Sequence, residues 1–580
     1  MNLFALLRRP HPPRPIDGFD YEAPPEPARA SPIALRVERP RGRVLIGMML
    51  FTMCYGAVIG RLVMFGIAGD QQTDALAKAQ KNLVATRPDI VDRNGEVLAT
   101  DIKAYSLIAE PRKIIDVDEA QEALVTVFPE LGTEPVRKKL ASRAGFVWLK
   151  REITDEQRRK IHRLGIPGLT FATETRRFYP GGPVAGHILG TVNDDNAGIV
   201  GIEKYIDEKT GVADLRAAGF AGEMPQEPQR LSIDLRVQHV VRDEIARAKD
   251  RYRALAAVGI VIDVRTGEII AMSSYPDFDP NNRAESQEKS RMNRATADAY
   301  EMGSVFKVFN TAMALDSGKV RFSESFDARG QLAIGSSRIS DFHGKNRVLS
   351  LPEIFIYSSN IGSVRMAMRV GAQNQFEFFD RLGFHKHVPV ELPETAMPRF
   401  PHRFSDIYTA TMSFGHGIAV SPLHTAAAAV AVVNGGKYLP PTLYKRSRDE
   451  AEKVAVQVLR PETSDQMRYL FRLNNVQGSG RRADVAGYVV GGKTGTAEKI
   501  TGRGYDGDKR FNSYLAAFPM DNPQYVVLTV VDEPKPEDGV GSATASMNAA
   551  PTLANIIRRI APMLGVMPRL DEVQPTLVAN

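Results

Sequence analysis

The sequence predicts an α+β protein with a single N-terminal transmembrane helix, an elongated mixed α/β pedestal domain, and a domain in which helices flank a central antiparallel sheet. Three observations lead to this prediction. The chain of 580 residues is too long for one hydrophobic core. An apolar run without charge stands near the N-terminus. In the second half, strand patterns cluster early and late with helical patterns between them, which favours an antiparallel sheet over alternating parallel units.

Composition places the chain among folded proteins and restricts its partners. Hydrophobic residues make up 43% of the chain and charged residues 25%, as in ordinary globular proteins. The formal net charge of +7 permits an anionic partner such as a membrane surface, but it is too small for this length to indicate nucleic acid. The single cysteine, Cys54, excludes a disulfide framework, and the ten histidines lack metal-ligand spacing. We therefore predict no metal and no cofactor.

The N-terminal part predicts a membrane anchor. Residues 1–43 are rich in Pro and Arg, which is typical of an extended, unpacked tail. The uncharged run from Val44 to Gly60 resumes beyond Arg61, so we predict a transmembrane helix over residues 44–66. A cleaved signal peptide is the alternative, but the tail is long and no A-x-A-like cleavage site stands out. The arginines that precede this apolar run predict that the tail stays in the cytoplasm and that the chain after the transmembrane helix is exported.

A pedestal domain is predicted over residues 67–230. It opens with a polar helical neck at residues 70–87, and Asn94-Gly95 between two short apolar runs predicts a hairpin. Residues 118–164 alternate helical periodicities with charged faces, as in a small mixed domain. The Gly- and Pro-rich stretches that follow indicate loops and tight packing. Nothing in this part suggests an active site of its own.

A second large domain is predicted over residues 231–565, with a C-terminal tail over residues 566–580. Residues 258–272 predict strand, turn, strand around Arg265-Thr266-Gly267. Further strands are predicted over residues 487–496, 513–518 and 525–531. Helices are predicted over residues 300–315, 354–367 and 421–434.

The chemistry of the chain centres on the helix predicted over residues 300–315. Gly303 leads into Ser304 and a segment that is apolar on nearly every side, which predicts a buried helix. Ser304 and Lys307 are three residues apart, so a helix places both side chains on one face. Burial lowers the pKa of a lysine, and the resulting amine base can activate a serine hydroxyl. We therefore predict acyl transfer through Ser304, with Lys307 as its base.

Three short motifs occur in a fixed order: S-x-x-K at 304–307, S-x-N at 358–360 and K-T-G at 493–495. A decoy exists for each, at residues 286–289, 546–548 and 209–211. The decoys lie in charged or terminal segments, and the decoy K-T-G precedes both serine motifs. Strand alternation puts Lys493 and Gly495 on one face. The missing side chain of Gly495 leaves room there for the serine helix or for a substrate.

This set of motifs is shared by penicillin-binding proteins and serine β-lactamases. Together with the segments that flank the motifs, it makes the sequence resemble a class B penicillin-binding protein, and the resemblance covers nearly the whole chain from the anchor onward. The flanking segments that carry it are IVDRNGEVLA at 90–99, RFYPGG at 177–182 followed by His187, GIVGIEKYID at 198–207, TGEIIAM at 266–272 and SFGHGIAVSPLH at 413–424. Within the family, the single anchor and the absence of appended C-terminal repeats look most like the transpeptidases of the division septum. The elongation transpeptidase is the close alternative.

The resemblance implies peptidoglycan D,D-transpeptidation outside the cytoplasm, by a single-pass protein of the bacterial inner membrane. Ser304 would attack the penultimate D-alanine of a stem peptide. Ser358 would relay a proton to the leaving D-alanine, and Asn360 would hold the substrate amide and Lys307. Lys493 would keep the site positive and draw the terminal carboxylate.

The resemblance further implies that Thr494 and Thr496 bind this carboxylate around Gly495. The backbone N–H groups of Ser304 and Thr496 would then form the oxyanion hole.

The implied partners are D-Ala-D-Ala stem peptides, nascent glycan strands, β-lactams, the lipid bilayer, and a membrane glycosyltransferase of the shape and division family with other division proteins. The pedestal would be a dimerisation-type interaction module. Two other functions remain open. In a D,D-carboxypeptidase or a β-lactamase, water takes the acyl group. In a membrane-anchored scaffold or β-lactam sensor, the catalytic site is vestigial.

Overall fold

The computed structural model describes residues 48–62, 87–194, 196–210, 227–401, 403, 405–502, 504–539 and 541–569. The chain separates into two compact units, Met1–Lys81 and Asn82–Asn580. In the first unit, residues 48–62 are helical. Across the described residues, no helix combines the length and the apolar character needed to span a membrane. The rest of the span predicted over residues 44–66, and the predicted neck as far as residue 86, lie outside the described residues.

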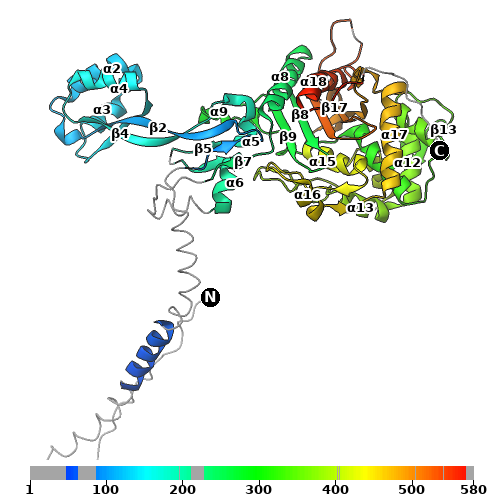
Figure 1. Ribbon diagram of the computed structural model, residues 1–580, viewed down its shortest axis with the longest axis horizontal. Coiled ribbons are helices and arrows are strands. Elements are labelled where there is room, and N and C mark those ends of the chain that lie inside the picture. Colours follow the sequence, from blue (N-terminus) through cyan, green and yellow to red (C-terminus); the bar gives the residue numbers. More distant parts are fainter. Residues whose placement is uncertain are drawn as a thin grey trace, which may run out of the picture. The chain divides into compact units, whose positions relative to one another are not determined.

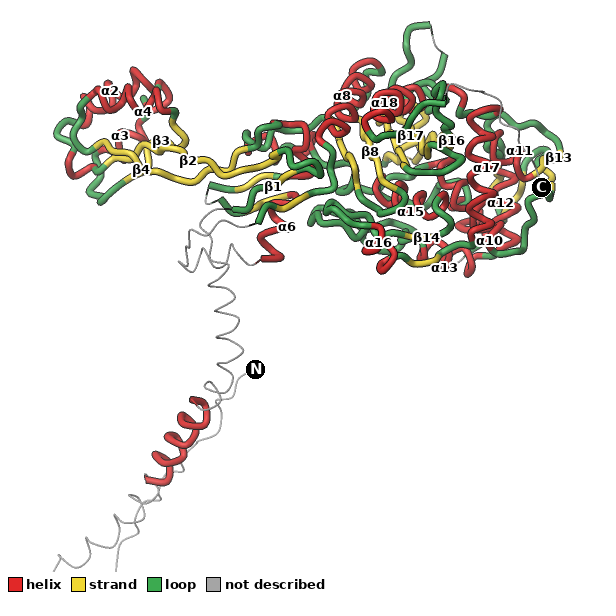
Figure 2. Tube along the Cα trace, in the orientation of Figure 1, coloured by secondary structure: helices red, strands yellow, loops and turns green. Residues whose placement is uncertain are grey.

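A five-stranded sheet forms the frame of the described part of the pedestal domain, residues 87–194, 196–210 and 227–230. Its strand order is β3-β2-β1-β7, and β4 also pairs with β2. The predicted hairpin is confirmed, with β1 (Ile90–Val91) returning through a turn into β2 (Val97–Ala109). β3 (Val147–Ile153) and β4 (Leu169–Phe178) run antiparallel to β2, whereas β7 (Gln229–Arg230) runs parallel to β1. Figure 2 shows the longer strands β2, β3 and β4 in yellow.

Three helices pack at one end of the pedestal sheet: α2 (Val117–Val127), α3 (Glu134–Leu140) and α4 (Asp155–Leu164). Helix α4 begins with a capping box, because the Thr154 side chain and the Gln157 side chain each bind the other residue's backbone N–H. Leu124 and Ile161 from these helices are buried in one apolar cluster with Leu107 of β2. The mixture of helices and strands predicted for this segment is confirmed.

The other end of the pedestal consists of short elements: η3 (Gly182–Ala185), α5 (Gly186–Leu189), β5 (Thr191–Val192), β6 (Gly198–Val200) and α6 (Gly201–Thr210). A buried ion network joins α6 to Arg87 and to strands β2 and β4. Glu203 of α6 accepts hydrogen bonds from Arg87 Nε at 2.7 Å and from Arg177 Nε at 2.6 Å. Arg87 also pairs with Asp207, and Arg177 with Asp101. Because these side chains are nearly inaccessible to water, each charge depends on its partners.

The second half of the chain is built on a five-stranded antiparallel sheet, as predicted. Its strand order is β16-β17-β18-β8-β9, so β16 is an edge strand. The strands are β8 (Ala256–Asp263), β9 (Ile269–Tyr275), β16 (Gly491–Thr501), β17 (Gly504–Phe518) and β18 (Tyr525–Asp532). Every neighbouring pair is antiparallel.

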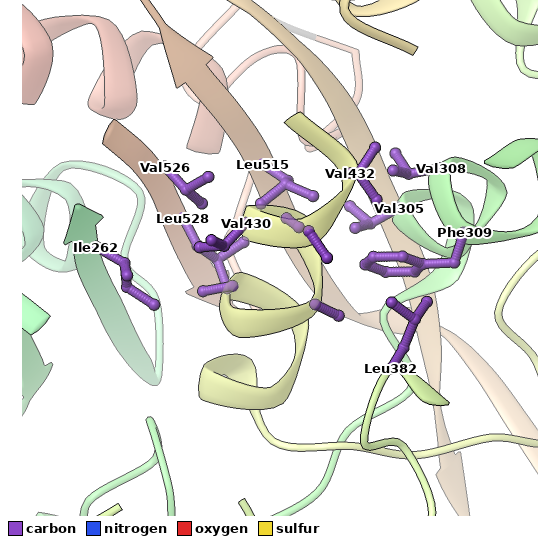
Figure 3. Close-up of a cluster of buried hydrophobic side chains, with 14 of the residues drawn as sticks. Ile262, Val305, Val308, Phe309, Leu382, Val430, Val432, Leu515, Val526 and Leu528 are labelled. Carbon is purple, nitrogen blue, oxygen red and sulfur yellow. The ribbon is translucent and has the colours of Figure 1, made fainter. Parts of the chain in front are cut away.

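Alternating side chains give this sheet two apolar faces. On one face, Val261 and Val527 share a buried cluster with residues of α8 (Leu235–Arg251) and α18 (Ala549–Met563), which contact the sheet (Figure 1). On the other face, Ile262, Leu515 and Leu528 lie beside Val430 and Val432 of α15 (Pro422–Val433), as Figure 3 shows.

Figure 3 also places Val305, Val308 and Phe309 next to this second cluster. The segment that carries Ser304 is therefore packed into the core between α15 and its other neighbours, α12 (Asn360–Val370) and α17 (Pro461–Gln477).

The remaining described elements are η1 (Pro111–Lys113), η2 (Pro129–Leu131), α9 (Arg283–Ser286), η4 (Lys289–Arg291), β10 (Ser325–Asp327), β11 (Leu332–Ile334), β12 (Ser337–Ile339), β13 (Val348–Ser350), α13 (Ala372–Arg381), α14 (Asp406–Met412), β14 (Lys437–Tyr438), α16 (Arg448–Val454), β15 (Val456–Gln457) and η6 (Arg481–Ala483).

Two predicted helices differ in detail. The helix predicted over residues 300–315 begins as a 3-10 turn, η5 (Gly303–Phe306), and continues as α10 (Lys307–Asp316). The helix predicted over residues 354–367 is two helices, α11 (Leu351–Tyr357) and α12, because Ser358 adopts a left-handed conformation with φ of 57° and ends the first one.

The strand predicted over residues 487–496 begins only at Gly491. Gly487 has φ of 83°, and the Tyr488 N–H donates to the Val485 carbonyl, so this part of the segment is a turn.

Replacing Glu203 by Gln is expected to lower the free energy of unfolding by about 3–5 kcal/mol, because two buried guanidinium groups lose the charge that they share. Glu156→Gln is the matched control, since Glu156 pairs with Lys160 on an exposed helix face and its loss has little effect. The midpoint of urea unfolding is measured for both variants by circular dichroism and by the fluorescence of Trp148, the sole tryptophan. Equal midpoints for the two would contradict the structural role of the network.

Candidate active site

Ser304 and Lys307 meet as the sequence predicts. Ser304 lies in the 3-10 turn η5, and Lys307 is the first residue of α10. The Lys307 Nζ atom is 3.1 Å from Ser304 Oγ, and the lysine side chain is almost fully buried. The short turn brings the two residues, three apart, onto the same side of the chain. An amine and a hydroxyl are therefore in hydrogen-bond contact inside the protein.

The S-x-N motif supplies the other partners of Lys307. Lys307 Nζ donates to the Ser358 carbonyl at 2.6 Å and to Asn360 Oδ1 at 2.7 Å, and it lies 3.1 Å from Ser358 Oγ. The left-handed conformation of Ser358 turns both its carbonyl and its hydroxyl toward the lysine. Such a conformation costs a non-glycine residue roughly 1–2 kcal/mol and persists where the surroundings fix it.

Lys493 of β16 completes the cluster. Its Nζ atom donates to Ser358 Oγ at 3.0 Å and to the Thr494 carbonyl at 3.2 Å, and its side chain is fully buried. The Ser358 hydroxyl therefore lies between two lysine amines. All three motifs meet at this hydroxyl although they are far apart in the sequence.

Burial controls the ionisation of both lysines. It lowers the pKa of Lys307 well below that of an ordinary lysine, the positive charge of Lys493 lowers it further, and the Asp341 carboxylate acts in the opposite direction. Burial also lowers the pKa of Lys493, to about 7. A neutral amine at Lys307 can accept the proton of Ser304, which makes the serine a nucleophile.

Gly495 and Gly303 allow close backbone contacts beside the serine. A Cβ atom at Gly495 would lie 2.4 Å from the Met302 carbonyl oxygen and 2.8 Å from Val305 Cγ2, so the predicted space is filled by the serine segment. A Cβ atom at Gly303 would lie 2.7 Å from the Thr496 carbonyl oxygen. The backbones next to Ser304 and Thr496 are therefore adjacent, as a shared oxyanion site requires.

The two threonines after Lys493 keep defined partners. The Thr494 hydroxyl is 2.8 Å from Ser479 Oγ, and Thr496 Oγ1 accepts a hydrogen bond from the Ala545 N–H at 3.2 Å.

Because β16 is at the edge of the sheet, a peptide can pair with it by strand addition. A pocket of about 470 Å³ lies further along this strand, with Glu301, Ala497 and Glu498 among its lining residues.

Two site residues have no signal in the local sequence. Asp341, in the loop after β12, accepts hydrogen bonds from Ser359 Oγ and from the backbone N–H groups of Asn360 and Ile361. Ser479, after α17, holds Thr494. Both reach the motifs through tertiary contacts only, since neither belongs to a motif or to a periodic segment. Sequences of relatives would be needed to find them.

The decoy motifs lie elsewhere in the fold. Lys209 and Thr210 end α6, and Asn548 caps α18 by accepting from the Ala549 N–H. Ser286 ends the short helix α9, where its hydroxyl donates to the Arg283 carbonyl. Among the described residues, no group of His, Cys, Asp and Glu side chains could hold a metal ion.

Comparisons with known proteins identify the family to which the chain is similar. The family model described as "Penicillin binding protein transpeptidase domain" matches residues 257–558, and the model described as "Penicillin-binding Protein dimerisation domain" matches residues 82–210. The "Probable peptidoglycan D,D-transpeptidase FtsI" of Caulobacter vibrioides is 38% identical over 92% of this chain and 90% of its own length. "Stage V sporulation protein D" of Bacillus subtilis is 30% identical over 91% of this chain and 87% of its own.

A solved structure extends the comparison to the fold. The transpeptidase domain of penicillin-binding protein 3 from Burkholderia pseudomallei, without ligand, is 30% identical to this chain with a TM-score of 0.53. It covers 59% of this chain and 98% of its own. The chain therefore belongs to the penicillin-binding proteins, and its paired dimerisation and transpeptidase domains assign it to class B.

Proposed function

We propose that this protein is a peptidoglycan D,D-transpeptidase that cross-links stem peptides through an acyl-enzyme on Ser304. One observation carries the proposal, namely the continuous set of contacts from Ser304 through Lys307 and Ser358 to Lys493. It provides a nucleophile, a buried amine base, a proton relay and a cation within one site. The name of the Caulobacter relative supports the same reaction.

Acylation uses these groups in sequence. Ser304 Oγ attacks the carbonyl carbon of the penultimate D-alanine while Lys307 Nζ takes the hydroxyl proton. The negative oxygen that forms is bound by the N–H groups of Ser304 and Thr496, each worth about 3–4 kcal/mol. The C–N bond then breaks, and the terminal D-alanine leaves with a proton that passes from Lys307 through Ser358.

Deacylation repeats these steps with a second stem peptide. Its amine attacks the ester carbonyl, gives a proton to Lys307, and forms the new amide as Ser304 Oγ regains its proton. Lys493, together with the hydroxyls of Thr494 and Thr496, binds the carboxylate of the donor peptide around Gly495. Asn360 holds the donor amide. β-Lactams acylate Ser304 in the same way, because they present a reactive amide and a carboxylate.

We assign the reaction to septal wall synthesis at the inner membrane. FtsI is the name given to the division-septum transpeptidase, and a relative that bears it aligns with almost the whole chain. Residues 44–66 would cross the membrane once, and residues 48–62 within this segment are helical. The tail 1–43 then lies in the cytoplasm and the catalytic domain outside it. A membrane glycosyltransferase and other division proteins would bind the anchor and the pedestal.

The domain limits proposed for this arrangement are those predicted from the sequence: tail 1–43, membrane helix 44–66, pedestal domain 67–230, transpeptidase domain 231–565 and C-terminal tail 566–580.

Ser304→Ala is expected to abolish covalent labelling of the membrane-bound protein by a fluorescent penicillin, because the hydroxyl that forms the ester is gone. Ser286→Ala, in the decoy S-x-x-K, should label like the wild type. Gel fluorescence measures labelling, and analysis of the products from a stem peptide separates cross-links from released D-alanine. Labelling that persists in Ser304→Ala would show that the nucleophile is another residue.

Lys307→Met is expected to lower the second-order rate constant for penicillin acylation by about 10²–10⁴, the usual contribution of a general base. Lys289→Met is the matched control, since Lys289 is the exposed lysine of the decoy motif. Stopped-flow acylation of the folded variants gives both rate constants. A Lys307→Met enzyme that acylates at the wild-type rate would remove Lys307 from the mechanism.

A further inference from the structure

Asp341 stands directly behind the S-x-N motif and uses both carboxylate oxygens to hold it. Oδ1 accepts from the Asn360 N–H at 2.6 Å and from the Ile361 N–H at 3.0 Å, and Oδ2 accepts from Ser359 Oγ at 2.7 Å. These donors form the N-terminus of α12, a helix of 11 residues. We propose that Asp341 is a positioning residue for acyl transfer, which fixes the start of α12 and thereby sets Ser358 and Asn360 against Lys307.

The orientation of Asn360 supports this role. Its Oδ1 atom accepts from Lys307 Nζ at 2.7 Å, and its Nδ2 atom donates to the Ser340 carbonyl at 3.0 Å. Ser340 and Asp341 are neighbours in one loop, so this loop holds both the backbone and the side-chain amide of Asn360. With Nδ2 held by the loop, the oxygen of the amide faces the lysine.

The contact between Asp341 and Ser359 also positions Ser358, which is the preceding residue in the chain. Ser359 is the N-cap of α12: its hydroxyl donates to Asp341 and accepts from the Gly362 N–H at 3.0 Å. Ser358 precedes this cap and has the left-handed conformation that directs its carbonyl and hydroxyl to Lys307. A negative charge at the N-terminus of α12 is also stabilised by the helix dipole.

The charge of Asp341 also acts on the amine of Lys307. Among the described residues, the charged or titratable groups that interact with this amine are Lys493 of β16, Asp341, and His416 of the loop after α14. Lys493 lowers the pKa of Lys307, and Asp341 raises it. Burial, and then the charge of Lys307, lower the pKa of His416 to about 4, so His416 is neutral at neutral pH. Asp341 is thus the group that opposes the effect of Lys493.

Two substitutions separate the charge of Asp341 from its hydrogen bonds. Asp341→Asn keeps an oxygen for the helix N–H groups and removes the charge, and its Nδ2 group replaces the oxygen that accepts from Ser359 Oγ. Lys307 then holds its proton less tightly, so the acid limb of the pH profile for penicillin acylation moves to lower pH, and the maximal rate falls less than in Asp341→Ala. Asp341→Ala also removes the hydrogen bonds, and misplacement of Ser358 and Asn360 lowers the maximal rate by about 10- to 100-fold.

Asp234→Asn is the matched control, because Asp234 caps the remote helix α8 by accepting from the Arg236 N–H at 3.1 Å. Rates are measured in the full-length protein and referred to the folded fraction from circular dichroism. The expected result is a shifted acid limb in Asp341→Asn and an unshifted one in Asp234→Asn. A wild-type rate per folded molecule in Asp341→Ala would overturn the proposal. Coincident profiles for Asp341→Asn and the wild type would overturn the effect of the Asp341 charge on Lys307.

This inference rests on the proposed function, and the experiment distinguishes the two failures. A wild-type protein that is folded but not acylated would overturn the proposed function. A wild-type protein that is acylated, with Asp341 variants that behave like it, would overturn only the role of Asp341.

Discussion

The Ser358 hydroxyl lies between two buried lysine amines, and the rest of the site depends on this contact. Two ammonium groups beside one oxygen repel each other where water does not reach. The pair therefore favours the state in which one amine is charged and the other is neutral. Burial lowers the pKa of both lysines, and the charge of Lys493 lowers that of Lys307 further. The neutral amine is then beside Ser304, and the charge stays at Lys493, where a carboxylate would bind.

The fold keeps these two lysines buried and close together. Lys307 begins a helix that is packed inside the domain, and Lys493 lies on the edge strand of the sheet. Gly495 lets that strand approach the serine segment, since any larger residue would meet the Met302 carbonyl. As an edge strand, β16 has a neighbouring strand on one side only, and a peptide can pair with its other side by strand addition. The same geometry therefore produces the low pKa of the base and a surface on which a substrate can lie.

Local patterns in the sequence predicted most of this arrangement. The apolar segment after Ser304 predicted a buried helix, and the order of the three motifs separated them from their decoys. The left-handed turn at Ser358 was missed because helical periodicity continues on both sides of it. The contacts of Asp341 with Asn360, and of Glu203 with Arg87, join residues that are distant in the sequence and follow no local pattern. Only the folded chain brings them together.

The pH dependence of wild-type acylation by benzylpenicillin tests the central claim most directly, because the carboxylate of this compound stays ionised from pH 5 upward. A base must be neutral, so the rate falls as the pH drops through the lowered pKa of Lys307. A binding cation must be charged, so the rate also falls as the pH rises through about 7, where Lys493 loses its proton. The account predicts this bell-shaped profile. A rate that climbs steadily toward about pH 10.4, the pKa of an ordinary lysine, would contradict it.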